Sequence, residues 1–352
     1  MTPPSVPHLR TPAERFSNLP GFPYKPHYLN YGNMRIAYID EKSGDNNPEV
    51  FLCIHGQPTW SYLYRKMIPI FLNYTTLATD RTPSRRVVAA DLLGFGRSDK
   101  PSRDEDYTFE FHRETLLHLV RALDLTNVTL VVQDWGGLLG LTLPIAEPTR
   151  FKRLIVMNTT LGVGATPTQG FLDWLAFTNR SPDMNVGRVI AGGTKHLSQA
   201  EIEAYNAPFP NKDYKGGVRR FPNLVMIRED MEGVDVSKKS LQMYKTEDLF
   251  RRNDVFMACE MKDPVLGPPV MESLARVWKN GCFYTEIADA GHFVQEWGDH
   301  VARLAIATFE KGDVVEGSLG IPDACCADSL RHLAHVISEL SALVYQPINS
   351  IL

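Results

Sequence analysis

Three residues that can carry chemistry each lie just after an apolar run of the chain. Asp134 follows the run VTLVVQ, Asp263 lies just past DVFMACE, and His292 lies just past CFYTEIA. Continuous β-branched runs of this length are typical of strands buried on both faces. Open parallel sheets bind ligands at the carboxyl ends of their strands, so the three side chains are predicted to meet at one edge. A nucleophile, an acid and a histidine in that place indicate a hydrolytic triad.

Asp134 begins the sequence Asp-Trp-Gly-Gly between a predicted strand and a predicted helix over 137–145. This is the strand–turn–helix context of a nucleophile elbow, in which serine is the usual nucleophile. Gly136 and Gly137 supply the small residues that the sharp turn needs. The alternative is a helix N-cap, a common position for aspartate. A carboxylate at an elbow would instead face the backbone N–H groups at the start of the helix.

A second loop, His55-Gly56-Gln57-Pro58, follows the first clear apolar run, 50–54. In hydrolases with such an elbow, the loop at this point contributes a backbone N–H group to an oxyanion hole. The N–H groups of Gln57 and Trp135 are predicted to form it. The chain order of nucleophile, acid and histidine is that of the α/β hydrolases.

The elements that must position these residues alternate along the chain. A helical pattern over 109–123 separates two of the strand-like runs, and alternating strands and helices predict a mostly parallel sheet flanked by helices. The proline-rich first stretch is interpreted as an irregular lead-in. Strands are expected at 50–54, 86–91, 128–133, 153–157, 254–260 and 282–288, and a closing helix at 294–310.

The strand rhythm stops from about residue 162 to residue 239, where proline, glycine and charged residues interleave with short helical patterns. We interpret 162–239 as an inserted helical cap, and 1–161 with 240–311 as the α/β-hydrolase core. Residues 312–352 form an expected C-terminal extension, a linker followed by an amphipathic helix over 323–345.

Composition excludes several classes of protein. The formal net charge is −4, which leaves no basic surface for nucleic acid. No apolar stretch has the length of a membrane span, and no signal peptide is evident. The five cysteines lack metal-ligand spacing and are expected to be unpaired thiols of a cytoplasmic protein. No metal is expected. We expect a monomer or a weak homo-oligomer.

A carboxylate nucleophile points to displacement at saturated carbon, giving an alkyl ester that water then hydrolyses. Halide and epoxide oxygen are both suitable leaving groups. An indole N–H donates without a competing acceptor, so Trp135 and Trp174 could bind a departing halide. An epoxide oxygen would need a proton donor, and that alternative rests on the tyrosines Tyr205, Tyr214 and Tyr244.

At this point the sequence resembles the haloalkane dehalogenases, in particular those whose second halide donor lies in the cap. The resemblance covers residues from about 20 to 311. The matching stretches are HGQPTWSYLYRKMIP (55–69), DLLGFGRSDKP (91–101), DYTFEFHRETLL (106–117), LTNVTLVVQDWGG (125–137), EAYNAPFPNKDYKGGVRRFP (203–222), MKDPVLGPPVM (261–271) and IADAGHFVQEWG (287–298).

The resemblance implies an eight-stranded sheet with a cap, and hydrolysis of haloalkanes to a primary alcohol, halide and a proton without a cofactor. It implies Asp134 as nucleophile, His292 as general base and Asp263 as the acid that orients it. Trp135 and Trp174 would hold the halide, and the backbones of Gln57 and Trp135 the oxyanion. Phe171, His55 and Pro58 would line the pocket.

Three rival readings are kept. An epoxide hydrolase would use the same triad with cap tyrosines facing Asp134. A haloacetate-hydrolysing relative would carry arginine where this chain has Trp135. A non-catalytic ligand-binding homologue would not need an intact triad.

Overall fold

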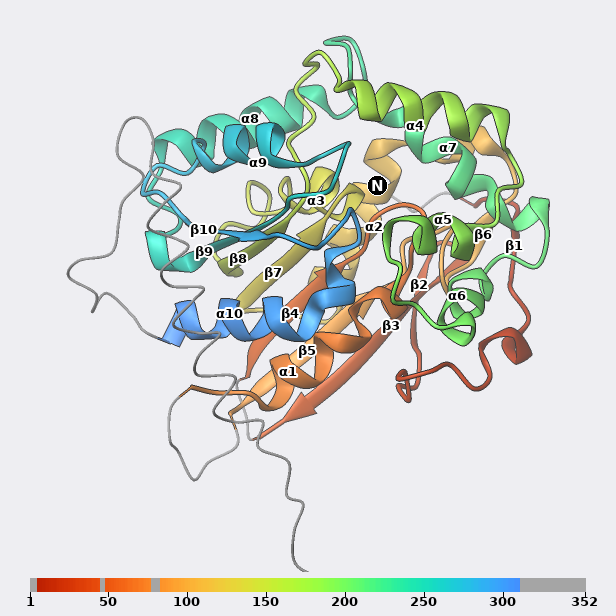
Figure 1. Ribbon diagram of the computed structural model, residues 1–352, viewed down its shortest axis with the longest axis horizontal. Coiled ribbons are helices and arrows are strands. Elements are labelled where there is room, and N and C mark those ends of the chain that lie inside the picture. The colour runs from red at the N-terminus through yellow and green to blue at the C-terminus, as the bar shows by residue number, and fades with distance from the viewer. Residues whose placement is uncertain (1–4, 45–47, 77–82, 311–352) are drawn as a thin grey trace, which may run out of the picture. The chain divides into compact units, whose positions relative to one another are not determined.

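The computed structural model describes residues 5–44, 48–76 and 83–310. An eight-stranded sheet runs through it in the order β10-β9-β8-β7-β4-β5-β3-β2. Its six strands from β10 to β5 are parallel, and β3 and β2 are added antiparallel at one edge. The eight-stranded, mostly parallel sheet is therefore confirmed (Figure 1). The extension expected at 312–352 lies outside the described residues.

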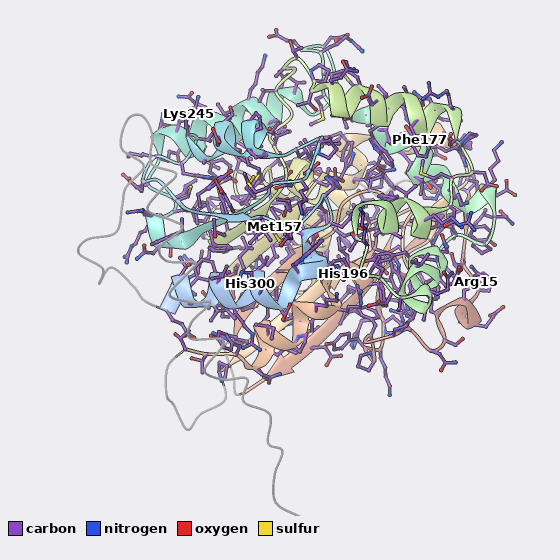
Figure 2. The ribbon with its side chains drawn as sticks, in the orientation of Figure 1. Arg15, Met157, Phe177, His196, Lys245 and His300 are labelled. Atoms are coloured by element: carbon purple, nitrogen blue, oxygen red, sulfur yellow. The ribbon has the colours of Figure 1, made fainter. Side chains whose placement is uncertain are left out.

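The parallel strands form where the apolar runs predict them. The residues of β4, β5, β7, β8 and β9 are mostly buried, since helices cover both faces of the sheet, whereas β10 at the edge is mostly half-exposed. Figure 2 shows side chains filling the space around the sheet, with Met157 in the interior. The strands are β4 Glu49–Ile54, β5 Arg85–Ala90, β7 Val128–Gln133, β8 Phe151–Met157, β9 Val255–Glu260 and β10 Phe283–Ile287.

The prediction of an irregular lead-in at the start of the chain is wrong. It contains β2 (His27–Tyr31) and β3 (Met34–Ser43), which form an antiparallel pair. β2 is an edge strand with exposed and half-exposed residues only, so it lacks the apolar run that marks a buried strand. β1 (His8–Leu9) and β6 (Lys100–Pro101) form a separate two-stranded antiparallel sheet.

Helices flank the sheet, and helices are present at 109–122, 135–140 and 298–310, near the three that the sequence predicts for the core. α1 (Ile68–Asn73) and α10 (Gly298–Glu310) lie next to each other on one face (Figure 1). α2 (Phe109–Ala122) begins at Thr108, whose side chain caps the helix by accepting from the N–H of Phe111. α3 (Trp135–Gly140) and α9 (Pro268–Ala275) follow β7 and β9 directly.

The segment between β8 and β9 contains helices joined by loops and no strand. Thr168, Asn185 and Ser198 cap the starts of three of its helices, and Ser198 forms a capping box with Glu201. The helices are α4 Gln169–Arg180, α5 Val186–Gly193, α6 Gln199–Asn206, α7 Gly216–Leu224 and α8 Val234–Thr246.

The cap boundary expected at residue 239 falls inside α8. The hydroxyl group of Tyr244, on α8, donates a hydrogen bond of 2.8 Å to the carbonyl oxygen of Leu141, just past α3. Because this contact joins α8 to the core, we propose that the cap ends before Val234. Within the described ranges, no helix combines the length and the apolar character needed to cross a bilayer.

Candidate active site

Asp134 lies at the sharp turn between β7 and α3, with φ 52° and ψ −125°. A non-glycine residue in this region is strained, and such strain is concentrated at functional sites. The turn also requires glycine two residues on, because a Cβ on Gly136 would lie 1.9 Å from the carbonyl oxygen of Ile54. Asp134 is the N-cap residue of α3, but its side chain makes no capping bond, so its carboxylate is free for other contacts.

The carboxylate of Asp134 faces the oxyanion loop and the histidine. The backbone N–H of Gln57 donates to Oδ1 at 2.7 Å, and Nε2 of His292 lies 3.6 Å from Oδ2. A Cβ on Gly56 would lie 2.4 Å from Oδ1, so this approach needs glycine. The nucleophile position, the oxyanion loop and the histidine are therefore brought together as the sequence predicts.

Asp263 holds the other side of the histidine ring. Its Oδ2 lies 2.8 Å from Nδ1 of His292, and the N–H of Val265 donates to its Oδ1 at 2.8 Å. Burial alone would raise the pKa of Asp263, but the positive charge and hydrogen bond of His292, with further hydrogen bonds, lower it to about 2. The acid is thus ionised over the ordinary pH range.

The charge state of His292 is set by two carboxylates. Burial opposes protonation, but the charges of Asp263 and Asp134, and the hydrogen bonds to them, raise the pKa of His292 well above its ordinary value. While both carboxylates are ionised, His292 is therefore held as the imidazolium. A group that neutralised Asp134 would lower the pKa of His292.

Asn158 is a functional residue that the sequence reasoning missed. It follows β8 directly and is fully buried. Its Nδ2 donates to Oδ2 of Asp263 at 2.7 Å, and its Oδ1 accepts from the backbone N–H of Glu260 at 2.9 Å. Like the triad residues, Asn158 is a polar residue just past the carboxyl end of a buried strand. This sequence signal could have identified it.

Gln133, the last residue of β7, fixes the loop that carries the histidine. Its Nε2 donates to the carbonyl oxygen of His292 at 2.9 Å and lies 3.1 Å from the ring nitrogen Nε2. Other nucleophile elbows have a small residue at the position before the nucleophile. Here the larger Gln133 makes these two contacts with the histidine loop.

A cavity of about 1020 Å³ opens above Asp134. Its lining is mostly apolar and includes Gln57, Trp135, Phe171 and Trp174, all expected at the site. Trp135 is buried and Trp174 is half-buried on α4. A mostly apolar lining strengthens the electrostatic effect of the few polar groups beside Asp134.

Contrary to expectation, His55 and Pro58 are not among the residues that line this cavity. His55 is fully buried beneath the loop, where its Nδ1 lies 2.8 Å from the carbonyl oxygen of Gly56 and its Nε2 accepts from the N–H of Leu92 at 3.0 Å. Burial lowers the pKa of His55, so it is a neutral ring that braces the oxyanion loop.

A buried ion pair lies next to the histidine loop. Arg65, in the 3-10 helix Ser61–Lys66, makes two bonds to Glu296, Nη1 to Oε1 at 2.6 Å and Nη2 to Oε2 at 2.7 Å. Glu296 belongs to the 3-10 helix Val294–Trp297, directly after the histidine loop. A planar, two-bond pair of this kind fixes the relative position of the two segments.

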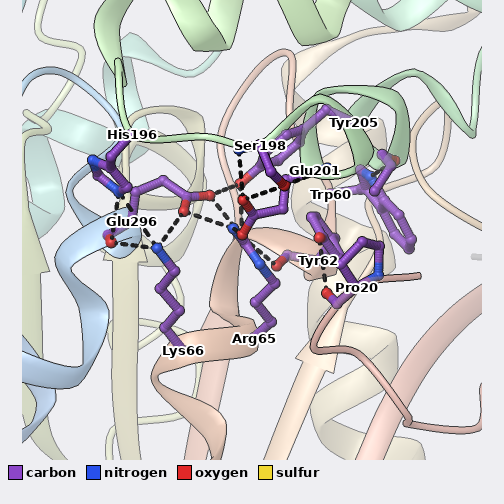
Figure 3. A network of polar contacts seen from close by, with 11 residues as sticks. Pro20, Trp60, Tyr62, Arg65, Lys66, His196, Ser198, Glu201, Tyr205 and Glu296 are labelled. Atoms are coloured by element: carbon purple, nitrogen blue, oxygen red, sulfur yellow. Dashed lines mark hydrogen bonds and ion pairs between the residues drawn. The ribbon is translucent and has the colours of Figure 1, made fainter.

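The same pair reaches the cap, as Figure 3 shows. The hydroxyl of Tyr205 on α6 contacts Glu296, and Arg65 also bonds Glu201 of α6 at 2.7 Å. Lys66 adds an ion pair of 3.0 Å to Glu296. We call these five residues the cap clamp. It joins α6, the histidine loop and the segment after the oxyanion loop.

No group of three or more potential metal ligands occurs within the ranges that the structure describes. The cysteines Cys53, Cys259 and Cys282 are buried and unpaired, while Cys325 and Cys326 lie outside the described residues. The polar groups in contact with the triad residues include Asn158, Gln133 and the backbone of the oxyanion loop.

The sheet order, the strained elbow and the triad define the class of protein, an α/β hydrolase. A family model described as the alpha/beta hydrolase fold matches residues 49–299. The chain is 40% identical over 309 residues to the haloalkane dehalogenase of Psychrobacter cryohalolentis, covering 85% of this chain and 96% of that one. It is 39% identical to that of Mycolicibacterium paratuberculosis, covering 82% and 93%.

Among solved structures, the tetrameric haloalkane dehalogenase DpaA from Paraglaciecola agarilytica NO2 is 47% identical, with a TM-score of 0.79, and covers 86% of this chain and 99% of that one. The chain belongs to the haloalkane dehalogenase family. The resemblance noted from the motifs is thereby confirmed, and with it the class of enzyme, a hydrolase.

Proposed function

We propose that this protein hydrolyses haloalkanes. A haloalkane and water react to give an alcohol, a halide ion and a proton. The observation that carries the proposal is the carboxylate of Asp134 at the elbow, between the N–H of Gln57 at 2.7 Å and the ring of His292 at 3.6 Å. This carboxylate lines a large apolar cavity, the environment that a haloalkane needs.

In the first half of the reaction, an oxygen of Asp134 attacks the carbon that bears the halogen. The carbon–oxygen bond of an alkyl ester forms as the carbon–halogen bond breaks, and the bonding pair leaves with the halide. Trp135 and Trp174 both line the cavity, so their indole N–H groups are the proposed donors to the halide.

In the second half, water attacks the carbonyl carbon of the ester and His292 accepts the water proton. Negative charge develops on the ester oxygen of Asp134, where the N–H groups of Gln57 and Trp135 stabilise it. Asp263 stabilises the imidazolium that forms. The bond between the carbonyl carbon and the alkyl oxygen then breaks, the leaving oxygen takes the proton of the hydroxyl group that water added, and the alcohol leaves Asp134 as a carboxylate and His292 as the cation.

The two carboxylates beside His292 support this order of events. In the free enzyme both raise the pKa of His292 and hold it as a cation, which is no base. Esterification removes the charge of Asp134, so the pKa of His292 falls. The histidine becomes a base only when there is an ester to hydrolyse.

The epoxide hydrolase alternative has less support. Within the described residues, no tyrosine lines the cavity. The hydroxyl group of Tyr205 is engaged by Glu296 and Arg65, and that of Tyr244 donates to Leu141. Tyr214, the third candidate, is half-buried and also outside the lining. Trp135 speaks against a haloacetate substrate, and the intact triad against a non-catalytic protein.

The test offers the purified protein a panel of bromoalkanes and terminal epoxides, with bromide and diol as the measured products. We expect bromide release with the matching alcohol and no diol. Diol formation without bromide release would overturn the dehalogenase proposal in favour of the epoxide alternative, and neither product would favour a non-catalytic protein.

A variant tests the roles of the residues. In His292→Gln, the first half can proceed and the second cannot, so one bromide per active site should be released and an alkyl adduct retained. Intact-mass measurement should find this adduct, and peptide mapping should place it on Asp134. Turnover at the wild-type rate without an adduct would contradict the role of His292 as base.

Location and assembly are proposals of the same kind. We propose a cytoplasmic location, supported by the unpaired thiols of Cys53, Cys259 and Cys282, and cell fractionation tests it. The sequence reading favours a monomer or weak homo-oligomer, whereas the DpaA relative is described as tetrameric. Light scattering during size exclusion distinguishes these states.

A further inference from the structure

Gln133 contacts the proposed base of the reaction at the nitrogen that must take the proton. Its Nε2 lies 3.1 Å from Nε2 of His292, closer than the 3.6 Å that separates this ring nitrogen from Oδ2 of Asp134. Gln133 is fully buried at the end of β7 and directly precedes the nucleophile. None of the steps proposed for the reaction uses this side chain, although it touches the reacting nitrogen.

The surroundings of the Gln133 side chain decide which end of its amide faces the ring. Its Nε2 lies 2.9 Å from the carbonyl oxygen of His292, and a carbonyl oxygen can only accept a hydrogen bond. The amide group at that place must therefore be the NH2 group, because an amide oxygen there would face another oxygen. The other end, Oε1, accepts from Nε2 of Gln295 at 3.5 Å. One N–H is thus directed to the carbonyl oxygen, and the second is available to the ring.

An amide N–H that faces a ring nitrogen favours one protonation state of the ring. Nδ1 of His292 lies 2.8 Å from Oδ2 of Asp263, so in the neutral ring Nδ1 keeps its proton and Nε2 has the lone pair. The amide of Gln133 can then donate to Nε2. In the imidazolium, two N–H groups would face each other across 3.1 Å. Gln133 therefore stabilises the neutral ring and not the cation.

The ionisable groups closest to His292 act in the opposite direction or are neutral. The carboxylates of Asp134 and Asp263 raise the pKa of the ring. Glu260, at the end of β9, is fully buried, and burial together with the charge of Asp263 raises its pKa well above the ordinary value, so it is a neutral acid. The other ionisable groups nearby are Lys195, His196, Lys262 and Asp289 in the cavity wall, and Glu296, which is paired with Arg65.

We propose that Gln133 is a positioning residue for the general base, and that its amide holds Nε2 of His292 free of a proton once Asp134 has become an ester. Before that step, two carboxylates outweigh one hydrogen bond and the ring is a cation. After it, Asp263 is the remaining carboxylate of the triad, and the amide favours the neutral ring that the attack of water requires. When Nε2 takes the proton of water, the N–H···N bond breaks and the amide keeps its bond to the carbonyl oxygen. The inference rests on the proposed dehalogenase function and deepens it.

The test measures the rate of the second half of the reaction against pH. In single turnovers of 1-bromobutane, bromide reports the first half, and loss of the alkyl ester, followed by rapid quench and intact mass, reports the second. Gln133→Met keeps an unbranched side chain of similar length without its donors. Loss of a donor to the neutral ring raises the pKa of His292, so the midpoint of the pH profile of ester loss should move up by about 0.5–1 pH unit. The first release of bromide should keep its wild-type rate, because that step does not use His292 as a base.

A control variant separates this effect from the loss of a buried amide. Gln295→Met removes the neighbouring buried glutamine, which bonds the far end of the Gln133 amide, and should leave the midpoint in place. If Gln133 only held the histidine loop, Gln133→Met would slow ester loss at every pH without moving the midpoint. That outcome would overturn the inference, and so would an equal movement of the midpoint in both variants.

A second measurement leaves Gln133 in place and decides the question if Gln133→Met does not fold. Asp134→Ala removes the charge of the nucleophile, as the ester does. With isotopically labelled nitrogen in the glutamine side chains and histidine rings, NMR should detect a scalar coupling between Nε2 of Gln133 and Nε2 of His292 once the pH is high enough for the ring to be neutral. A neutral ring without this coupling would overturn the inference.

The outcomes separate this inference from the function beneath it. If the wild-type protein released no bromide in the first turnover, the dehalogenase proposal itself would be wrong. If it released bromide and the pH profile of ester loss were the same in Gln133→Met, the proposed function would stand and only the role of Gln133 would be lost.

Discussion

Asn158 shows how much the triad depends on a residue that takes no part in the bond changes. Its side-chain amide donates to Asp263 and accepts from the backbone of Glu260, both inside the buried core. The amide therefore fixes the carboxylate plane of Asp263 against the ring of His292. We regard Asn158 as a positioning residue for the second half of the reaction.

Asn158→Ala should lower kcat about tenfold, since a hydrogen bond to a buried charged group contributes about 1.5–3 kcal/mol. The first release of halide should keep its rate while the alkyl ester accumulates, because only the hydrolysis step needs Asp263 to orient the base. Rapid quench followed by mass measurement reports both quantities.

The control for this variant is Asn179→Ala, which removes an exposed amide bonded to Asn223 in the cap. It should leave both steps unchanged. A slower first halide release in Asn158→Ala, without accumulated ester, would assign Asn158 to general stability of the site instead.

At the residue scale, the sequence predicted those catalytic side chains that directly follow a recognisable apolar run. Asp134, Asp263 and His292 each follow an apolar run, and the structure brings them together as expected. Asn158 has the same local signal, but its importance depends on Asp263, 105 residues away. His55 was misassigned because sequence shows its place next to the oxyanion loop and not the direction of its ring.

The cap clamp is the main polar link between elements near the site. Both Arg65 and Glu296 are buried, so each depends on the other for its lost hydration. Removing one member of such a pair leaves a buried charge without its partner, which commonly costs about 3–5 kcal/mol. The clamp thereby ties the placement of α6 to that of the histidine loop.

Arg65→Leu should lower the free energy of unfolding by about 3 kcal/mol, which urea unfolding followed by fluorescence measures. The matched control is Arg103→Leu, which breaks an exposed pair with Asp106 and should not move the urea midpoint measurably. Equal midpoints for the two variants would contradict the role given to the clamp.

At the element scale, burial decided what could be predicted. β4, β5, β7, β8 and β9 are mostly buried strands with apolar runs, and they and the half-exposed β10 appear within two residues of their expected ends. β2 was missed because an exposed edge strand carries no such run. The expected cap boundary at residue 239 falls inside α8, and the proposed earlier end of the cap rests on a contact of Tyr244 that the sequence does not reveal.

The stability of the whole molecule should depend on pH through the Asp263–His292 pair. The pKa of Asp263 falls from 3.8 to about 2 on folding, so its contribution is present above about pH 4 and is lost as the pH falls towards 2. The pKa of His292 is raised from 6.5, so its contribution is complete below about pH 6.5 and is lost as the pH rises through the higher folded value.

Asp263→Asn should therefore lose stability relative to the wild type mainly between about pH 4 and 6.5, by about 2 kcal/mol. Below pH 4 the difference should shrink, because the wild type loses the same contribution on protonation. Urea midpoints measured in steps from pH 3 to 8 give this difference curve. A difference that did not vary with pH would mean that the pair contributes through packing alone.

The position of His292 between two carboxylates also determines when the reaction acidifies its surroundings. A histidine that enters the cycle as a cation must give up its proton to solvent before it can take one from water. The proton counted among the products then appears with the halide, ahead of the alcohol. A pH indicator in a stopped-flow experiment should change colour in the first turnover before any alcohol is formed, and in His292→Gln that early acid pulse should be missing.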